Sequence, residues 1–247
     1  FSNYRRSYIN ENITKSIDKK DALAVAKKYL CSDTFEPELK RIFRKNSVGV
    51  TKGIPVHYLV QSDNAHRLAD TLVSSLYSNN RLGCARYTVL DLYNLSARSS
   101  DIRELFRVCS GSTIIMNCCG LKCTNSDNCT ADETIPDIIF DLINAYKNEI
   151  QFIFTFSNDG PSLPDAVEEK LGAITFVKLA DDTVENEDAH KYLRKLCREE
   201  NTSCDKDLLS LCAKDTPYRA SELMGMYDTW YSNVLKTKIY PQYSNFK

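Results

Sequence analysis

Apolar residues in the first 50 or so positions repeat at helical intervals. One stripe consists of Leu23, Ala26 and Leu30, and a second lies at 39–43, shortly after Pro37. Spacings of three and four residues place apolar side chains on one face of an α-helix, and proline is favoured in the first turn of a helix. The N-terminal region is therefore predicted to be a helical collar.

From Ile54 onward, short apolar runs alternate with amphipathic stretches. This alternation is typical of βαβ units, in which parallel strands are joined by crossover helices. The pattern predicts five strands with one helix in each crossover. We expect the strands at about 55–60, 85–91, 112–117, 151–157 and 173–178, and the helices at about 65–77, 101–108, 135–147 and 164–171.

Beyond Asp182 the strand pattern stops and helical spacing returns. Three helices are predicted, at 186–200, 205–214 and 217–235, the last with Thr216 as its cap and Pro217 at its first position. The sequence thus favours an α/β core with its collar over residues 1–180 and a helical lid over residues 181–247.

Composition narrows the classes of partner. The 247 residues contain 32 basic and 33 acidic side chains, a formal net charge of -1, so no basic footprint indicates nucleic acid or anionic lipid. Apolar runs such as 54–60 and 152–156 are far shorter than the ~18 residues of a membrane span, so no membrane partner is expected.

Ten cysteines, mostly within predicted helices and strands, indicate reduced thiols. We expect a soluble, cytoplasmic protein. Because the chain starts at Phe1 with no apolar signal stretch, we expect either a processed product or, as the favoured alternative, an excised piece of a longer polypeptide.

The turn after the first predicted strand is the place where a phosphate usually binds, because the following helix points its free N–H groups at this edge of the sheet. This turn occupies the register of G-x-x-x-x-G-K-[S/T] but has lost both glycines and the final hydroxyl, and only a basic charge remains. The eight residues are Gln61, Ser62, Asp63, Asn64, Ala65, His66, Arg67 and Leu68.

Three further stretches, in their order and spacing, resemble the AAA+ ATPase family. Residues 96–106 resemble the segment after its second strand, 152–158 its fourth strand with the sensor-1 position, and 163–179 the following helix and fifth strand. The resemblance covers nearly the whole chain. It implies an α/β fold with a five-stranded parallel P-loop-type sheet flanked by helices and a C-terminal helical lid.

The resemblance also allows the catalytic positions to be compared one by one. Where the family has an Asp for Mg²⁺ and a Glu for the attacking water, this chain has Asn117 and Cys118. An amide brings no negative charge, and a thiol does not act as a base toward water. Asn158 matches sensor 1, with a polar strand-end cap as its alternative role. Arg219 matches sensor 2, with an exposed helix arginine as its alternative.

The arginine finger offered to a neighbouring subunit is also missing. At the end of the fourth helix this chain has Glu168, Glu169 and Lys170. Acidic side chains would repel a neighbour's phosphate, and lysine lacks the planar fork of arginine.

These losses imply a degenerate, catalytically inactive AAA+-like module with no catalytic residue and no cofactor. It would be a structural or regulatory part of a larger ATPase assembly or tandem chain, with other AAA+ modules as partners in cis or in a ring. One alternative is an ATP-binding module with an atypical P-loop, which would take ATP and Mg²⁺. A second is an ATPase-silent subunit that handles nucleic acid, although nucleic acid is an unlikely partner because the basic residues near 191–198 are interleaved with acidic ones.

Four cysteines lie between positions 118 and 129, which is enough for a tetrahedral zinc site. Their spacing lacks a C-x2-C knuckle, and adjacent Cys118 and Cys119 on an extended strand end would point in opposite directions. Only Cys119, Cys123 and Cys129 would remain as ligands. We therefore expect free thiols and no metal.

Overall fold

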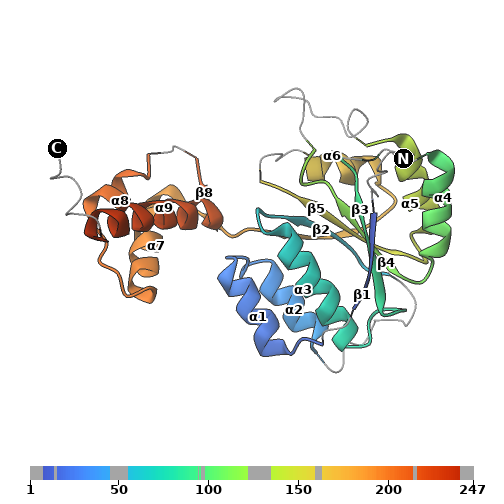
Figure 1. The fold of residues 1–247 in the computed structure, drawn as a ribbon, viewed down its shortest axis with the longest axis horizontal. Helices are drawn as coiled ribbons and strands as arrows, with labels where there is room; N and C mark the ends of the chain where they lie inside the picture. Colours follow the sequence, from blue (N-terminus) through green and yellow to red (C-terminus); the bar gives the residue numbers. More distant parts are fainter. Residues whose placement is uncertain are drawn as a thin grey trace. The chain divides into compact units, whose positions relative to one another are not determined.

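The computed structural model describes residues 8–13, 16–44, 55–93, 95, 98–121, 135–158, 163–213 and 216–239. The chain forms two compact units, the first spanning Phe1–Ala180 and the second Asp181–Lys247 (Figure 1). Across the described ranges, we find no helix with both the length and the apolar character needed to cross a bilayer.

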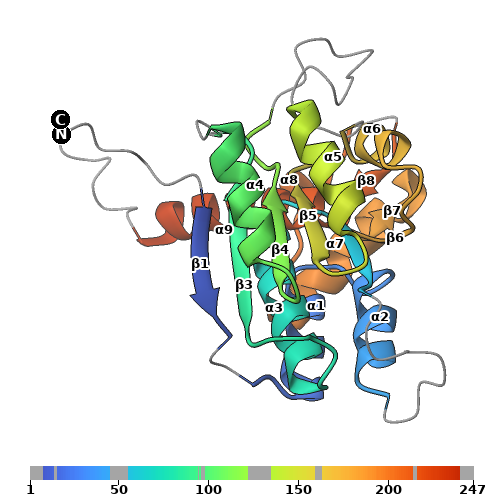
Figure 2. The ribbon, with the colours of Figure 1, turned by 90° about the vertical axis from the view of Figure 1, so that its right-hand side faces the viewer.

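A six-stranded sheet forms the centre of the first unit, in the order β1-β3-β4-β5-β2-β6. The five strands from β2 to β6 are parallel, while β1 pairs antiparallel with β3 along the sheet edge (Figure 2). The prediction of five strands therefore missed one strand of the sheet, the antiparallel edge strand β1. The bounds are β1 Tyr8–Asn12, β2 His57–Gln61, β3 Arg86–Asp91, β4 Thr113–Asn117, β5 Gln151–Phe156 and β6 Phe176–Ala180.

The prediction of an entirely helical N-terminal region is thus wrong for β1. All five residues of β1 are exposed, so no apolar periodicity signals a strand there. The strand is held instead by its ladder with β3, in which Ile9 lies opposite Val89 and Glu11 opposite Tyr87.

Helices cover both faces of this sheet. The helices α1, α2 and α3 share one apolar cluster with the sheet, and α4, α5 and α6 share another on the opposite face (Figures 1 and 2). Strands buried on both sides require such cover. The bounds are α1 Lys19–Lys28, α2 Phe35–Ile42, α3 Ala65–Ser78, α4 Ser99–Val108, α5 Asp137–Tyr146 and α6 Leu163–Lys170.

The last parallel strand begins three residues later than predicted, at Phe176. After α6 the chain forms a tight turn, in which Leu171 N–H donates to the Val167 carbonyl and Ile174 N–H to the Leu171 carbonyl. Ile174 is buried in this turn, so its apolar character reflects turn packing and not strand pairing.

Three helices and a small two-stranded sheet form the second unit. The prediction that no strand follows Asp182 is wrong, because β7 and β8 pair antiparallel. The final helix begins at Ala220, not at Pro217, since Tyr218 and Arg219 belong to β8. The bounds are β7 Thr183–Val184, α7 Asn186–Glu199, α8 Lys206–Ser210, β8 Tyr218–Arg219 and α9 Ala220–Ile239.

A buried ionic network ties α2 to β2. The Tyr58 side chain has no exposed surface, and its hydroxyl donates to Glu38 Oε1 at 2.8 Å. Arg41 binds the same carboxylate through two hydrogen bonds of 2.7 Å. Burial, followed by the Glu38 carboxylate, raises the pKa of Tyr58 well above its usual value, so the phenol remains a donor.

The first prediction concerns this phenol. Tyr58→Phe keeps the ring but leaves the buried Glu38 carboxylate one donor short, so we expect a loss of about 1.5 to 3 kcal/mol in unfolding free energy. Urea unfolding followed by circular dichroism measures it. Tyr77→Phe, at an exposed position on α3, serves as the control and should change stability by less than about 0.5 kcal/mol. Equal effects from the two variants would contradict the assigned network.

His57, the first residue of β2, is a buried neutral ring. Its Nδ1 accepts from Phe152 N–H at 3.1 Å, and its Nε2 lies 3.0 Å from the Lys147 carbonyl, which fixes the proton on Nε2. The ring also stacks on Phe152. Burial lowers the pKa of His57 from 6.5 to about 4.

The second prediction is a pH dependence of stability. Between about pH 6.5 and pH 4 the unfolded chain protonates His57 and the folded chain does not, so stability falls as the pH falls through this window. The shift corresponds to about 3 kcal/mol at pH 4. Because carboxylates also titrate there, wild type should be compared with His57→Gln in urea unfolding at pH 7 and pH 4.5. His57→Gln should lose less stability on acidification, and parallel pH profiles would refute the assignment.

Candidate functional site

The helices that follow β2 and β5 diverge at the carboxyl ends of these strands, the position at which open α/β sheets form a ligand crevice. These two strands are adjacent and parallel, but β2 continues into α3 on one face while β5 continues toward α6 on the other. Ligands of open α/β sheets bind outside the carboxyl ends of strands where following helices diverge in this way. The predicted turn at 61–68 and Asn158 both lie at this edge.

The turn after β2 satisfies its own backbone. Ser62 N–H donates to the Phe156 carbonyl at 3.0 Å, and Ala65 N–H donates to the Ser62 carbonyl at 3.1 Å. The buried Ser62 hydroxyl accepts from Asn64 N–H at 3.0 Å. The amides of Ser62, Asn64 and Ala65 are therefore already bonded within the chain.

Backbone conformation agrees with this closure. In the described ranges, positive φ values occur at Leu30, Asn80, Gly111 and Asn201, and none falls within 61–68. A phosphate-cradling loop uses glycines because its backbone must adopt such values and approach the phosphates closely. The turn is an ordinary strand-to-helix connection.

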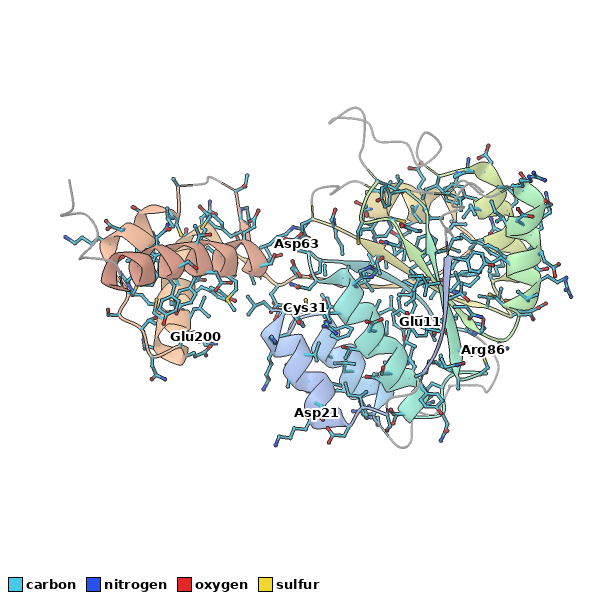
Figure 3. All side chains as sticks on the ribbon, in the orientation of Figure 1. Glu11, Asp21, Cys31, Asp63, Arg86 and Glu200 are labelled. Carbon is cyan, nitrogen blue, oxygen red and sulfur yellow. The ribbon has the colours of Figure 1, made fainter. Side chains whose placement is uncertain are left out.

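Asp63 and Asn158 meet across the crevice. Asn158 N–H donates to Asp63 Oδ1 at 3.3 Å, so a carboxylate of the chain itself occupies an anion-accepting position. Asp63, which is labelled in Figure 3, lies just beyond the end of β2. Asp63 is exposed, and its negative charge would repel a phosphate. The predicted turn at 61–68 and the predicted strand-end residue Asn158 are thus in direct contact.

The rest of the turn divides between core and surface. Ala65 and Leu68 are buried in the apolar cluster under α3. Gln61 shares a sheet face with Leu59 on the opposite side, where its Nε2 is buried without a hydrogen-bond partner among the described residues. His66 and Arg67 are exposed on the first turn of α3.

Asn117, at the end of β4, organises the neighbouring strand ends. Its Nδ2 donates to Asp91 Oδ1 at 3.2 Å, and its Oδ1 accepts from Cys119 N–H at 3.1 Å. The next residue, Cys118, is buried in the cluster on the opposite face, and burial raises the pKa of its thiol well above the usual value. Neither residue offers a carboxylate for Mg²⁺ or for water activation.

Beside this edge lies an open groove of about 460 Å³. We call it the β1–β3 groove, because its floor is the part of the sheet formed by these two edge strands. The floor carries Ile9, Glu11, Tyr87, Val89 and Asp91, and Asn117 closes one end.

The wall of the groove is the first part of α3, which contributes His66, Arg67 and Asp70. The groove exists because α3 packs over β2 and β5, nearer the centre of the sheet. The edge strands β1 and β3 are therefore left uncovered by α3, and their side chains on this face are both apolar and polar.

Carboxylates dominate the electrostatics of the groove. Tyr87 donates its hydroxyl to Glu11 Oε2 at 2.5 Å, and Asp70 lines the same groove. Partial loss of hydration raises the pKa of Asp70 and that of Asp91, and the nearby His66 opposes both shifts. Three carboxylates, Glu11, Asp70 and Asp91, therefore stand against one guanidinium, that of Arg67, in the lining of the groove.

The sequence prediction missed three of these carboxylates. Asp91 could have been found by the argument used for Asn117, because it ends the preceding strand in the same way. Asp70 lies one helical turn after His66 on α3. Glu11 gave no signal, because β1 was predicted to be helical.

The remaining predicted residues fall elsewhere. Arg219 belongs to β8 of the second unit, where its N–H donates to Glu222 Oε2 at 2.9 Å at the start of α9. The prediction that Arg219 lies in the first turn of the last helix is therefore wrong, because α9 begins one residue later, at Ala220. Cys123 and Cys129 lie outside the described residues, while Cys119 is half-buried. The described ranges contain no group of three or more His, Cys, Asp or Glu side chains arranged to hold a metal ion.

Comparison with known proteins gives limited results. No family model matches the chain, and no curated protein matches it. One similar solved chain belongs to the HORMA:CdnC:Trip13 complex of E. coli MS115-1, with 11% identity, a TM-score of 0.39, and coverage of 81% of this chain and 76% of that chain. Another comes from a structure on katanin self-assembly, with 13% identity, a TM-score of 0.40, and coverage of 92% and 75%.

The third prediction concerns metal content. We expect protein purified without chelator to contain no stoichiometric zinc or iron, because the spacing of the cysteines lacks a knuckle and Cys118 is buried. Inductively coupled plasma mass spectrometry measures this directly. Bound metal at one equivalent, lost in Cys119→Ser but retained in the control Cys84→Ser, would overturn the expectation.

Proposed function

We propose that this chain is an AAA+-like module that does not hydrolyse ATP and that serves as a structural or regulatory part of a larger ATPase assembly or tandem chain. The resemblance of its segments to that family motivates the proposal. The arrangement of parallel strands, with a crevice at the ends of β2 and β5, is compatible with it. The other assignments, ATP binding through an atypical turn or nucleic-acid handling, have less support from the contacts described above.

One observation carries the proposal, the closure of the turn at 61–68 by its own hydrogen bonds. The Ser62, Asn64 and Ala65 amides are bonded within the chain. The Asp63 carboxylate accepts the amide of Asn158 from across the crevice. Since a phosphate would have to displace these contacts and tolerate the carboxylate, a nucleotide gains little by binding here.

Residues at the other catalytic positions have local partners. Asn117 is engaged with Asp91 and Cys119. Lys170, at the position of the arginine finger, lies 3.4 Å from Asp137 and over the Phe140 ring. These contacts favour structural roles for both side chains.

The fourth prediction is that ATP with Mg²⁺ leaves the melting temperature unchanged. A ligand at one hundred times its Kd stabilises a folded protein by about 2.7 kcal/mol, so even weak specific binding is detectable at millimolar ATP. Differential scanning fluorimetry with ATP, ADP and inorganic phosphate provides the measurement.

The alternative of an atypical ATP site has its own signature. It requires an upward shift with ATP that disappears in Arg67→Ala, because this residue is the remaining cation of the turn. Arg103→Ala, at an exposed position on α4, is the matched control and should not affect such a shift. Observing this pattern would reject the proposed inactive module.

A further inference from the structure

Two cysteines of the second unit pack into one apolar cluster where α7 ends and α8 begins. Cys197 is a member of this cluster and is only 1% exposed. Cys204 is half-buried and packs against the same cluster. Both are free thiols. The two residues belong to different parts of the chain, and they come together because the chain reverses direction between them.

The end of α7 produces this reversal. Asn201 has a positive φ of 52°, and its N–H donates to the Arg198 carbonyl at 3.2 Å. Thr202 N–H donates to the Cys197 carbonyl at 2.8 Å, and the Thr202 hydroxyl donates to the same oxygen at 3.2 Å. This pair of backbone bonds around a left-handed residue is the Schellman motif, which turns the chain back at the end of a helix. The segment that carries Cys204 therefore returns toward Cys197.

Contacts with α9 hold this returning segment on both sides of Cys204. On one side, the Thr202 hydroxyl lies 3.1 Å from the Tyr227 hydroxyl. On the other side, Asp205 Oδ2 accepts from Trp230 Nε1 at 3.2 Å. Because Cys204 lies between two anchored residues, its position against the cluster is fixed by the fold.

We propose that Cys197 and Cys204 form a reversible disulfide bond that makes the second unit sensitive to thiol oxidation, with a small-molecule disulfide as the oxidant. The Cys204 thiolate attacks one sulfur of that disulfide, whose S–S bond breaks and releases one thiolate. The Cys197 thiolate then attacks Cys204 Sγ, which breaks the mixed disulfide and releases the second thiolate. The two protons lost by the cysteines pass through solvent to the two released thiolates. Two protein thiols are thus oxidised while one small-molecule disulfide is reduced to two thiols.

Exposure decides the order of these steps, because an oxidant in solvent reaches Cys204 and not the buried Cys197. Burial, and next the Cys197 thiol, raise the pKa of Cys204, while Arg194 opposes this shift and Asp205 adds to it. The protonated thiol therefore predominates near neutral pH, and exchange is slow. The pair is suited to respond to prolonged oxidising conditions.

The bond would connect the last turn of α7 to the start of α8. A cross-link of this kind restricts the unfolded chain and so stabilises the folded unit. Trp230 is the only tryptophan of the chain, and it packs in the same cluster. Its fluorescence therefore reports the unfolding of the second unit. The inference goes beyond the proposed function and does not depend on it.

The fifth prediction identifies the bond in the full chain. The protein is incubated with millimolar oxidised glutathione at about pH 8, blocked with iodoacetamide and digested with trypsin. Cleavage after Lys195, Arg198 and Lys206 separates the two cysteines, so their bond joins peptide 196–198 to peptide 199–206. This linked pair should contain most of the Cys204 and should disappear on reduction. In Cys197→Ala, the glutathione adduct on Cys204 should be at least about tenfold more abundant than in wild type, because the resolving thiol is missing.

Urea unfolding followed by Trp230 fluorescence gives an independent readout. The transition of oxidised wild type should lie about 1 M higher in urea than that of the reduced protein, and dithiothreitol should reverse the shift. Cys204→Ser should show no such shift. The matched control Cys212→Ser removes another thiol packed against the same cluster and should behave as wild type. Circular dichroism establishes that every variant is folded.

Several results would overturn the proposal. One is a wild type that keeps the glutathione adduct on Cys204 to the same extent as Cys197→Ala. Another is a bond from Cys204 to Cys212 in place of the bond to Cys197. A linked pair 196–198 and 199–206 that leaves the urea transition of wild type unchanged would overturn the sensitivity of the second unit. None of these results bears on the ATP measurement.

Discussion

The position of β2 between β5 and β6 is the constraint on which the first unit depends. Both faces of β2 are buried, with Tyr58 and Val60 on one side and Leu59 on the other, so helices must cover the sheet on both sides. Because α3 follows β2 on one face and α6 follows β5 on the other, the two helices diverge at the ends of these strands. The ionic network of Tyr58 and the neutral ring of His57 hold β2 in this position.

The crevice and the groove behave differently because their polar groups are satisfied differently. In the crevice, the amides of the turn and the Asp63 carboxylate find partners within the chain. In the groove, Asp70 is exposed and Asp91 accepts a hydrogen bond from Asn117, and neither forms an ion pair within 4.0 Å with a described residue, although Arg67 lines the same groove.

The two compact units have separate apolar cores. The second unit buries its own aromatic cluster, in which Trp230 packs on Tyr227 and donates to Asp205. Since each unit folds around its own apolar core, charged side chains on its surface are free to serve recognition. The exposed side of α7, which carries both basic and acidic side chains, belongs to this surface and not to the core of its unit.

The sequence by itself determined the elements with strong local periodicity. Five parallel strands and the helices between them follow from alternating apolar runs, and the loss of glycine at 61–68 already argued against a phosphate loop.

Tertiary structure decided what depends on residues far apart in the chain. The exposed strand β1 exists through its ladder with β3, and β8 exists through its pairing with β7. Asp63 meets Asn158 only across the sheet edge, and Glu11 joins Asp70 only because β1 lies beside α3. Local patterns record burial along one element, whereas the partner of an edge strand or of a carboxylate is chosen by nonlocal packing, which leaves no periodic trace in the sequence.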